Sequence, residues 1–286
     1  MIIDFHTHAF PDRLAAGALA HLVDNARAYA HIYGPACPHT DATLDGLAAS
    51  SRRSGMDLSL VLPIATSPKP SQTINNFAAQ ADQYPGLRSF GTVHPENPDW
   101  EAELERVAAL GLRGIKLHPE YQGFFVDDPA CRAVVKRAAS LGLWVIFHAG
   151  ADIGMPPPIH CTPERVVRLR QDVPDAKIVL AHMGGFCLWE EVLRALPAMG
   201  TAIDTSYCIA AHPDRWPLFA AIIRAAGTAN VFFGTDSPWE DQKESLVATR
   251  RFLEQSGFEP AERAAILGGN AARVLGLSEA PDNTVV

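Results

Sequence analysis

Five short segments of the chain each end an apolar run on side chains that can bind a metal ion. They are IIDFHTH (2–8), GIKLHP (114–119), WVIFHAG (144–150), IVLAHMGG (178–185) and VFFGTDSPW (231–239). Alternate side chains of a strand point to opposite faces, so His6 and His8 share one face, with Asp4 before them. If the five runs are parallel strands of one closed sheet, their carboxyl ends converge. Imidazoles and a carboxylate would then surround a single ion, which makes the chain a candidate enzyme.

Each of these residues also has a structural interpretation. A His-x-His pair is a weak signal in a chain with 11 histidines, and the alternative is two buried, hydrogen-bonded histidines. His148 and His182 stand at equivalent strand ends, where neutral imidazoles suit zinc. Asp236 could bind the ion, take a proton from bound water, or cap the next helix. The shared position at strand ends favours the metal site.

A second set of residues could contact a substrate. Lys116 and His118 lie on one face of their strand and are expected to point into the lumen. Lys116 has three interpretations: a carbamylated ligand bridging two ions, a cation for a substrate carboxylate, or a lysine buried beside a carboxylate such as Asp204. His94, in another His-Pro pair, could line the pocket or act as a cap. Arg215 could bind an anionic substrate from a loop.

The elements that must position these residues alternate regularly along the chain. Eight runs are apolar on both faces, as expected of parallel strands covered on both sides. They span 2–6, 58–63, 87–93, 113–118, 144–148, 177–182, 201–206 and 230–236. Amphipathic segments lie between them; the one at 97–111, for example, has acidic residues in its first turn and a glycine at its end. Eight alternations predict a distorted (β/α)8 barrel that forms one domain over residues 1–286.

Two connections are long for a compact barrel. One runs from Ala9 to Asp57 and should contain two helices, the second beginning near Asp41. The other covers 150–164 and includes Asp152 and His160, which could contact substrate. Both follow the carboxyl ends of strands, where barrel active sites are built, so both are expected to border the site.

Composition excludes several classes of protein. A formal net charge of −8 and a pI of about 5.7 argue against a nucleic-acid surface. No apolar stretch approaches a membrane span, and the chain opens directly on a strand, so no cleaved signal is expected. The five cysteines show no CxxC spacing, which predicts reduced thiols in a cytoplasmic protein. The residues after Gly276 are expected to fray.

The segments DFHTH, FHAG, AHMGG and GTDSPW, with ILGGNAARVLGL at 266–277, resemble the amidohydrolase superfamily. They are most similar to its amidohydrolase-related branch, which includes aminocarboxymuconate-semialdehyde decarboxylase. The resemblance runs from Ile2 to Leu277, with the motifs in the family's order. It implies a metal-dependent barrel, most often with Zn²⁺ and sometimes with Mn²⁺ or another divalent ion, closed by a helix at 266–277.

Carried over by position, the resemblance implies that His6, His8 and His148 are metal ligands. Asp236 would bind the ion and help deprotonate water, and His182 would polarise the water or the substrate from just outside. The fourth strand, with GIKLHPEYQGF, departs from the decarboxylases of this branch. Oligomeric state stays open, although a homodimer is common among such barrels.

Metal-assisted hydrolysis is the first functional expectation. The ion would lower the pKa of a bound water from ~15.7 towards ~7, Asp236 would accept its proton, and His182 would help stabilise the oxyanion. The bond would be an amide, lactone or other carboxylic ester of a small molecule, which could be anionic. The alternative is non-oxidative decarboxylation of a small unsaturated or aromatic acid at the same ion. A barrel that only binds a ligand is a remote third, because stability alone gives no reason to gather these groups at a barrel mouth.

Overall fold

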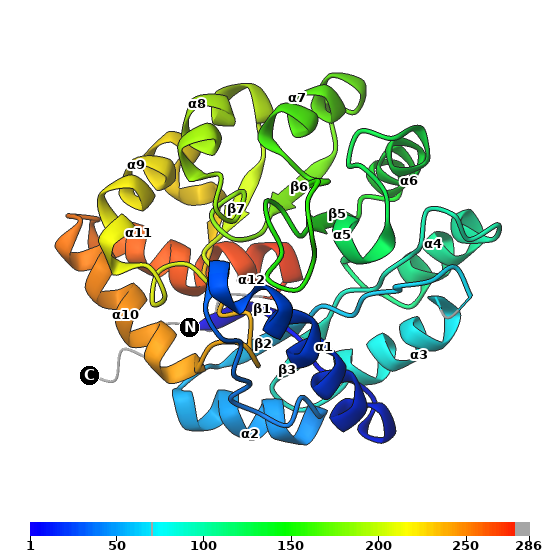
Figure 1. Ribbon diagram of the computed structural model, residues 1–286, viewed down its shortest axis with the longest axis horizontal. Helices are drawn as coiled ribbons and strands as arrows, with labels where there is room; N and C mark the ends of the chain where they lie inside the picture. Colours follow the sequence, from blue (N-terminus) through cyan, green and yellow to red (C-terminus); the bar gives the residue numbers. More distant parts are fainter. Residues whose placement is uncertain (70, 278–286) are drawn as a thin grey trace.

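All eight expected strands are present in the computed structural model, which describes residues 1–69 and 71–277 (Figure 1). They are β1 (Ile3–Thr7), β2 (Leu58–Val61), β3 (Leu87–Ser89), β4 (Gly114–Leu117), β5 (Trp144–Phe147), β6 (Lys177–Leu180), β7 (Ala202–Asp204) and β8 (Val231–Phe232). Parallel ladders join β1–β2–β3 and β4 through β8 in sequence order. The tail expected to fray, 278–286, lies outside the described residues.

Short hydrogen-bonded joints close these two sheets into one barrel. Between β3 and β4, Gly91 donates its amide to the carbonyl of Gly114 and accepts from the amide of Lys116, both at 2.8 Å. Between β8 and β1, the amide of Asp236 donates to the carbonyl of His6 at 2.8 Å. The predicted (β/α)8 barrel is therefore confirmed. It is distorted because these joints replace full ladders.

Helices surround the strands (Figure 1). They are α1 (Asp12–Tyr33) and α2 (Leu44–Ser54) after β1, α3 (Ser71–Asp82), α4 (Trp100–Ala109), α5 (Pro119–Gln122), α6 (Pro129–Ser140), α7 (Pro163–Asp172), α8 (Trp189–Met199), η1 (Pro213–Arg215) with α9 (Trp216–Ala226), η2 (Thr228–Asn230) and α10 (Gln242–Gln255). The second helix of the first connection begins at Leu44, where the Thr43 hydroxyl accepts from the Gly46 amide at 2.9 Å. Among the described helices, none has both the length and the apolar character needed to cross a bilayer.

The C-terminal helix closes the barrel at the amino ends of the strands, as the family resemblance implies. It consists of α11 (Pro260–Ala264), a π-helical turn η3 (Ala265–Gly269) and α12 (Asn270–Leu275). The side-chain Nδ2 of Asn270 donates to the carbonyl of Val231, at the start of β8, at 2.7 Å. A Cβ on Gly268 would lie 2.4 Å from the carbonyl oxygen of Met1. Only a glycine therefore lets the turn approach the start of β1 so closely.

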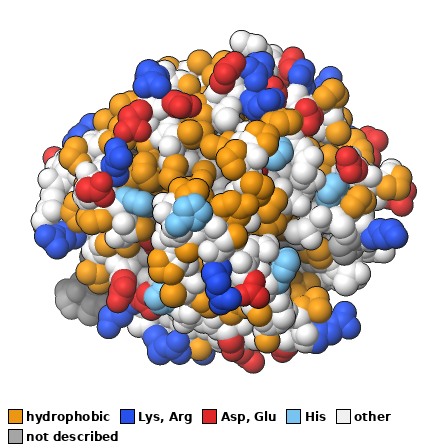
Figure 2. Space-filling model, in the orientation of Figure 1, with side chains coloured by type: hydrophobic (Ala, Val, Ile, Leu, Met, Phe, Trp, Pro, Cys, Tyr) orange, Lys and Arg blue, Asp and Glu red, His pale blue; other side chains and the backbone are white. Residues whose placement is uncertain are grey.

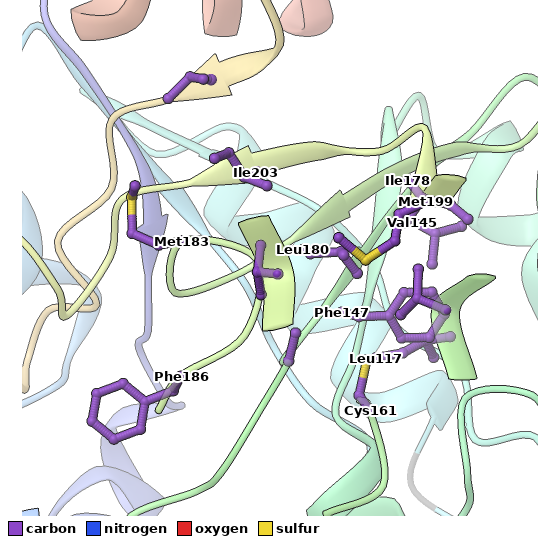
Figure 3. Close-up of a cluster of buried hydrophobic side chains, with 14 of the residues drawn as sticks. Leu117, Val145, Phe147, Cys161, Ile178, Leu180, Met183, Phe186, Met199 and Ile203 are labelled. Carbon is purple, nitrogen blue, oxygen red and sulfur yellow. The ribbon is translucent and has the colours of Figure 1, made fainter. Parts of the chain in front are cut away.

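Apolar side chains fill the lumen next to this closing helix. Phe5 stacks on Phe232 with ring centroids 4.3 Å apart, and Phe90 meets Phe5 edge-on at 6.0 Å. A larger cluster lies between the strands and the outer helices; Figure 3 shows part of it, with Leu117 and Phe147 from neighbouring strands close together. With both faces of the strands packed, the carboxyl end of the lumen is left for polar groups.

Strand β1 departs from simple alternation. Its pairing with β2 shifts register between Asp4 and Thr7. Asp4 accepts a hydrogen bond from Gln242 of α10 at 2.8 Å, and Gln242 also donates to Ser51 of α2 at 3.3 Å, so Asp4 points into the helical layer. His6 instead points into the lumen. The expectation that Asp4 shares a face with His6 is wrong, because an irregularity of this kind re-aims the side chains that follow it.

Candidate metal centre

A cavity of about 670 Å³ opens at the carboxyl ends of the strands. Helix α1 lies in front of β1, β2 and β3 in Figure 1 and contributes residues to the cavity lining. Polar and ionisable side chains gather at the cavity floor: His6, His8, Lys116, His118, Tyr121, His148, Asp152, His182 and Asp236. These residues come from strands β1, β4, β5, β6 and β8 or from the segments that follow them. The cavity is therefore the place where the barrel can do chemistry.

His6, His8 and Asp236 form a first group of donor atoms, all within 4.8 Å of one another. Oδ1 of Asp236 lies 3.3 Å from Nε2 of His6 and 3.1 Å from Nε2 of His8. The opposite nitrogens are engaged behind them: Nδ1 of His6 lies 2.8 Å from Oδ2 of Asp204, and Nδ1 of His8 lies 2.9 Å from the carbonyl of Leu62. Both of these partners are acceptors, so each Nδ1 carries a hydrogen, and in the neutral imidazole each Nε2 presents its lone pair.

This arrangement fits a divalent cation. A lone pair that faces a carboxylate oxygen at about 3 Å is repelled unless a proton or a cation lies between them. Burial, followed by the charge of Lys116, lowers the pKa of His6 to about 4, so His6 carries no extra proton at neutral pH. A histidine whose second nitrogen donates to a carboxylate, as His6 does to Asp204, is also the usual form of a metal-ligating imidazole.

The charge state of Asp236 suits the same role. Burial alone would raise the pKa of this carboxyl group, but the imidazoles of His6 and His8 beside it outweigh burial and hold it well below its usual range. Ionised carboxylate and neutral imidazole are the forms that bind metal. The backbone of Asp236 has a φ of +67°, a conformation that costs energy in a non-glycine residue and is often found at functional sites. Asp236 does not cap the next helix, since Asp241 caps α10.

His118, His148 and Asp152 form a second group of donor atoms within 4.8 Å of one another. Oδ2 of Asp152 lies 3.4 Å from Nε2 of His118 and 3.8 Å from Nε2 of His148. The two imidazole rings stack with centroids 4.1 Å apart. His148, expected beside His6 and His8, thus meets His118 on the neighbouring wall of the cavity. Asp152, expected in the long loop after this strand, joins them.

His182 connects the two groups. Its Nε2 lies 3.0 Å from Nδ1 of His148, and its Nδ1 lies 3.1 Å from the carbonyl of Ser206. The amide of His182 donates to Oδ1 of Asp204 at 3.0 Å. Asp204, a fully buried carboxylate at the end of β7, therefore supports both His6 and His182. Sequence reasoning named Asp204 only as a partner for Lys116, although its place at a strand end in TAIDTS was a usable signal.

Lys116 is fully buried and lines the cavity. Its Nζ lies 3.2 Å from Nε2 of His6. Burial lowers its pKa to about 8, against the opposing charges of Asp204 and Asp236. Lys116 thus belongs to the floor of the cavity, and His118, the residue directly after β4, lies there with it.

The structure does not bring His94 or Arg215 to the described lining of the cavity. Nδ1 of His94 accepts from the amide of Glu96 at 3.2 Å, the capping arrangement that the sequence left open. Arg215 is exposed and pairs with Glu190 at 3.0 Å. His160 is hydrogen-bonded through Nδ1 to the carboxylate of Glu120 in α5. These residues have local partners and no described contact with the cavity floor.

Comparison with known proteins finds similarity over almost the whole chain. A family model described as amidohydrolase matches residues 3–277. No curated protein sequence matches the chain. Among solved structures, 5-carboxyvanillate decarboxylase from Sphingomonas paucimobilis is similar with a TM-score of 0.69 and 21% identity, covering 97% of this chain and 99% of that one.

Two further structures extend the comparison. A dihydroxybenzoic acid decarboxylase from Polaromonas, solved with bound manganese and the inhibitor 2-nitroresorcinol, has a TM-score of 0.68 and 17% identity, covering 99% of both chains. A probable 2-pyrone-4,6-dicarboxylic acid hydrolase from Acinetobacter baumannii, with citric acid bound, has a TM-score of 0.63 and 18% identity, covering 96% of this chain and 99% of that one. At these identities the similarity establishes a shared fold.

Proposed function

The chain belongs to the amidohydrolase family, and on this basis we propose that it is a metal-dependent enzyme that removes CO2 from a small aromatic or unsaturated carboxylic acid. One observation carries the metal: the Nε2 lone pairs of His6 and His8 converge on the Asp236 carboxylate. The choice of decarboxylation rests on the similar structures, most of which are described as decarboxylases. The comparisons therefore favour decarboxylation, the alternative expected from the sequence, over hydrolysis.

We assign the ion to His6, His8 and Asp236, whose donor atoms converge. The family resemblance would add His148 as a fourth ligand, although in this structure it groups with His118 and Asp152. Imidazole suits zinc and carboxylate suits manganese; Zn²⁺ remains the first expectation, and manganese is bound in the Polaromonas relative. A divalent ion held here would supply a Lewis acid that withdraws electron density from the oxygens of the substrate.

The side chains of the cavity would carry out the remaining steps. Lys116 and His118 would hold the substrate carboxylate on the wall beside β4. The bond between the carboxylate and its carbon breaks, its electron pair stays on that carbon, and CO2 leaves. A proton from solvent, relayed through the Asp236 carboxylate, then reaches that carbon, while His182 helps to position the substrate. Atoms and charge balance because a carboxylate and one proton give CO2 and the protonated product.

Hydrolysis is the second candidate, and the fold shared with the probable 2-pyrone-4,6-dicarboxylic acid hydrolase supports it. In that case Asp236 would take a proton from the attacking water and His182 would stabilise the oxyanion of a lactone, amide or other ester. Lys116 would still bind an anionic substrate. Both reactions use the same groups, so only the substrate separates them.

A substrate screen tests the proposal. Metal-loaded protein would be incubated with hydroxybenzoates and unsaturated acids in one panel and with lactones in the other, with CO2 release and acid release as the readouts. We expect CO2 release that is lost in His8→Ala and after chelation. Arg215→Ala, a change at an exposed residue outside the described cavity lining, serves as a control and should retain the activity. Acid release from a lactone without any CO2 release would overturn decarboxylation in favour of the second candidate.

A further inference from the structure

Helix α1 presents an apolar face to the cavity instead of to the core. Of its 22 residues, only Ala15 and Ala26 are buried. Leu14, Ala18 and Leu22, spaced four residues apart and hence on one side of the helix, all line the cavity. Leu14 is 51% exposed. The face of α1 that would normally pack on protein therefore borders the cavity.

Other apolar side chains surround the space beneath α1. Ile64 and Phe77, from the segment after β2 and from α3, line one side, and Met155 and Phe186 line another. Figure 2 shows hydrophobic side chains gathered at the centre of this face of the molecule. The ionisable groups of the metal centre lie at the floor. The cavity is thus polar where the reaction would occur and apolar towards α1.

The cavity is large enough to hold a ligand that extends beyond the polar floor. About 670 Å³ lies within the range of roughly 300–1,000 Å³ typical of pockets that enclose drug-sized ligands. Apolar surface facing water is unfavourable, and burying it against an apolar ligand group relieves that cost. Among the described lining residues, the lysines and arginines are Lys116 at the floor and Arg13 on α1. One deep carboxylate and an uncharged body match this distribution of charge.

We propose that the substrate acid carries an apolar group beyond its reacting ring or double bond, and that this group packs under α1 against Leu14, Ala18 and Leu22. This inference rests on the proposed function, because the acid group is placed at the metal centre. It makes α1 the element that selects the substrate. Small polar hydroxybenzoates would fill only the floor.

Binding of a homologous series tests the inference. The probes are 4-alkylbenzoates from methyl to butyl, measured by isothermal titration calorimetry with the intact metal-loaded protein. Burying one methylene group contributes ~0.8 kcal/mol, which corresponds to about fourfold in Kd. We expect the affinity to rise about fourfold with each added methylene. A flat series would overturn the inference.

Variants locate the apolar site on α1. Leu14→Asn and Leu22→Asn should flatten the dependence on chain length, and Ala18→Trp should exclude the butyl compound while still admitting the methyl one. The matched control is Ile32→Asn, on the same helix but 60% exposed and outside the described cavity lining; it should keep the wild-type slope. Equal slopes in Leu14→Asn, Leu22→Asn and Ile32→Asn would also overturn the inference.

The same series separates this inference from the proposed function. The slope with chain length reports on α1, whereas the metal dependence of the affinity for unsubstituted benzoate reports on the floor. Repeating the titrations after chelation should weaken the binding of benzoate and leave the dependence of affinity on alkyl chain length unchanged. If the slope persists but benzoate binding does not depend on metal, the proposed function fails and the apolar site stands. If benzoate binding depends on metal but affinity does not change with chain length, the apolar site fails and the proposed function stands.

Discussion

At the scale of single residues, Asp204 supports two side chains of the cavity floor, His6 and His182, without lining the cavity itself. It is fully buried, accepts from Nδ1 of His6 at 2.8 Å and accepts from the amide of His182 at 3.0 Å. Burial would raise its pKa, but the neighbouring imidazole of His6 and the hydrogen bond that it donates hold the pKa well below its usual range. Asp204 therefore fixes the orientation of His6 and makes its Nε2 a better ligand.

We expect Asp204→Asn to weaken metal affinity by about 10–100-fold, the usual cost of losing such a supporting carboxylate. Affinity would be measured by competition with a chromophoric chelator. Asp175→Asn, the same chemical change at an exposed loop position, is the control and should bind metal like the wild type. Unchanged affinity in Asp204→Asn would mean that His6 does not bind the ion through Nε2.

Lys116 gives a second prediction at this scale. As the cation for a substrate carboxylate it would contribute a charged hydrogen bond, and its loss in Lys116→Met should weaken benzoate binding by about 10–100-fold. Metal content, measured by elemental analysis, should stay at the wild-type value. A fall in bound metal by one ion per chain would instead support the carbamylated bridge.

The convergence of His6, His8 and Asp236 could be anticipated from the sequence, because parallel strands bring their carboxyl ends together. The place of Asp152 beside His118 and His148 could not. It depends on where the loop after β5 returns, and no periodicity encodes that path. The same limit explains Asp4: a register shift in β1 turns it away from His6, and strand alternation alone predicts the opposite.

At the scale of elements, all eight strands were predictable from their apolar runs, but their carboxyl ends were not. Residues expected in strands, such as His182 and Asp236, have φ values of +59° and +67° and so leave the extended conformation. The functional ends of β6 and β8 are therefore shorter than the apolar pattern indicates. The closing helix was identified from its motif, and its contact with the start of β1 explains Gly268 within that motif.

We expect Gly268→Ala to lower the free energy of unfolding by about 1–3 kcal/mol, the usual cost of overpacking. The added Cβ would lie 2.4 Å from the carbonyl oxygen of Met1, so the closing helix must move away from β1. Gly269→Ala is the matched control, because its Cβ would come no nearer than 3.5 Å to the atoms around it. Urea denaturation followed by circular dichroism would distinguish them; equal stability of the two variants would contradict this view of the turn.

At the scale of the whole molecule, stability should depend on the ionisation of Glu240. This residue is buried, its Oε2 accepts from Ser245 at 2.7 Å, and its Oε1 has no hydrogen-bond partner among the described residues. Burial raises its pKa from 4.5 to about 7, and the charge of Asp236 adds to this. Because the folded state favours the protonated form, the stability that Glu240 contributes is complete below about pH 4.5 and is lost as the pH rises through about 7.

Glu240→Gln should therefore be more stable than the wild type at pH 8, by on the order of 2 kcal/mol, and the two should converge at low pH. Urea denaturation at a series of pH values would measure this difference. Glu244→Gln, at an exposed position of α10, the helix that follows Glu240, should keep the pH dependence of the wild type. A Glu240→Gln variant less stable than the wild type at pH 8 would contradict the assignment.

X-ray diffraction from crystals of protein purified without added metal would show whether His6, His8 and Asp236 hold one ion. Data would be collected on both sides of the absorption edge of the metal found by elemental analysis. We expect one anomalous peak per chain, about 2.0–2.2 Å from Nε2 of His6, Nε2 of His8 and a carboxylate oxygen of Asp236. A metal peak elsewhere, or protein that contains metal without a peak among these three side chains, would contradict this assignment.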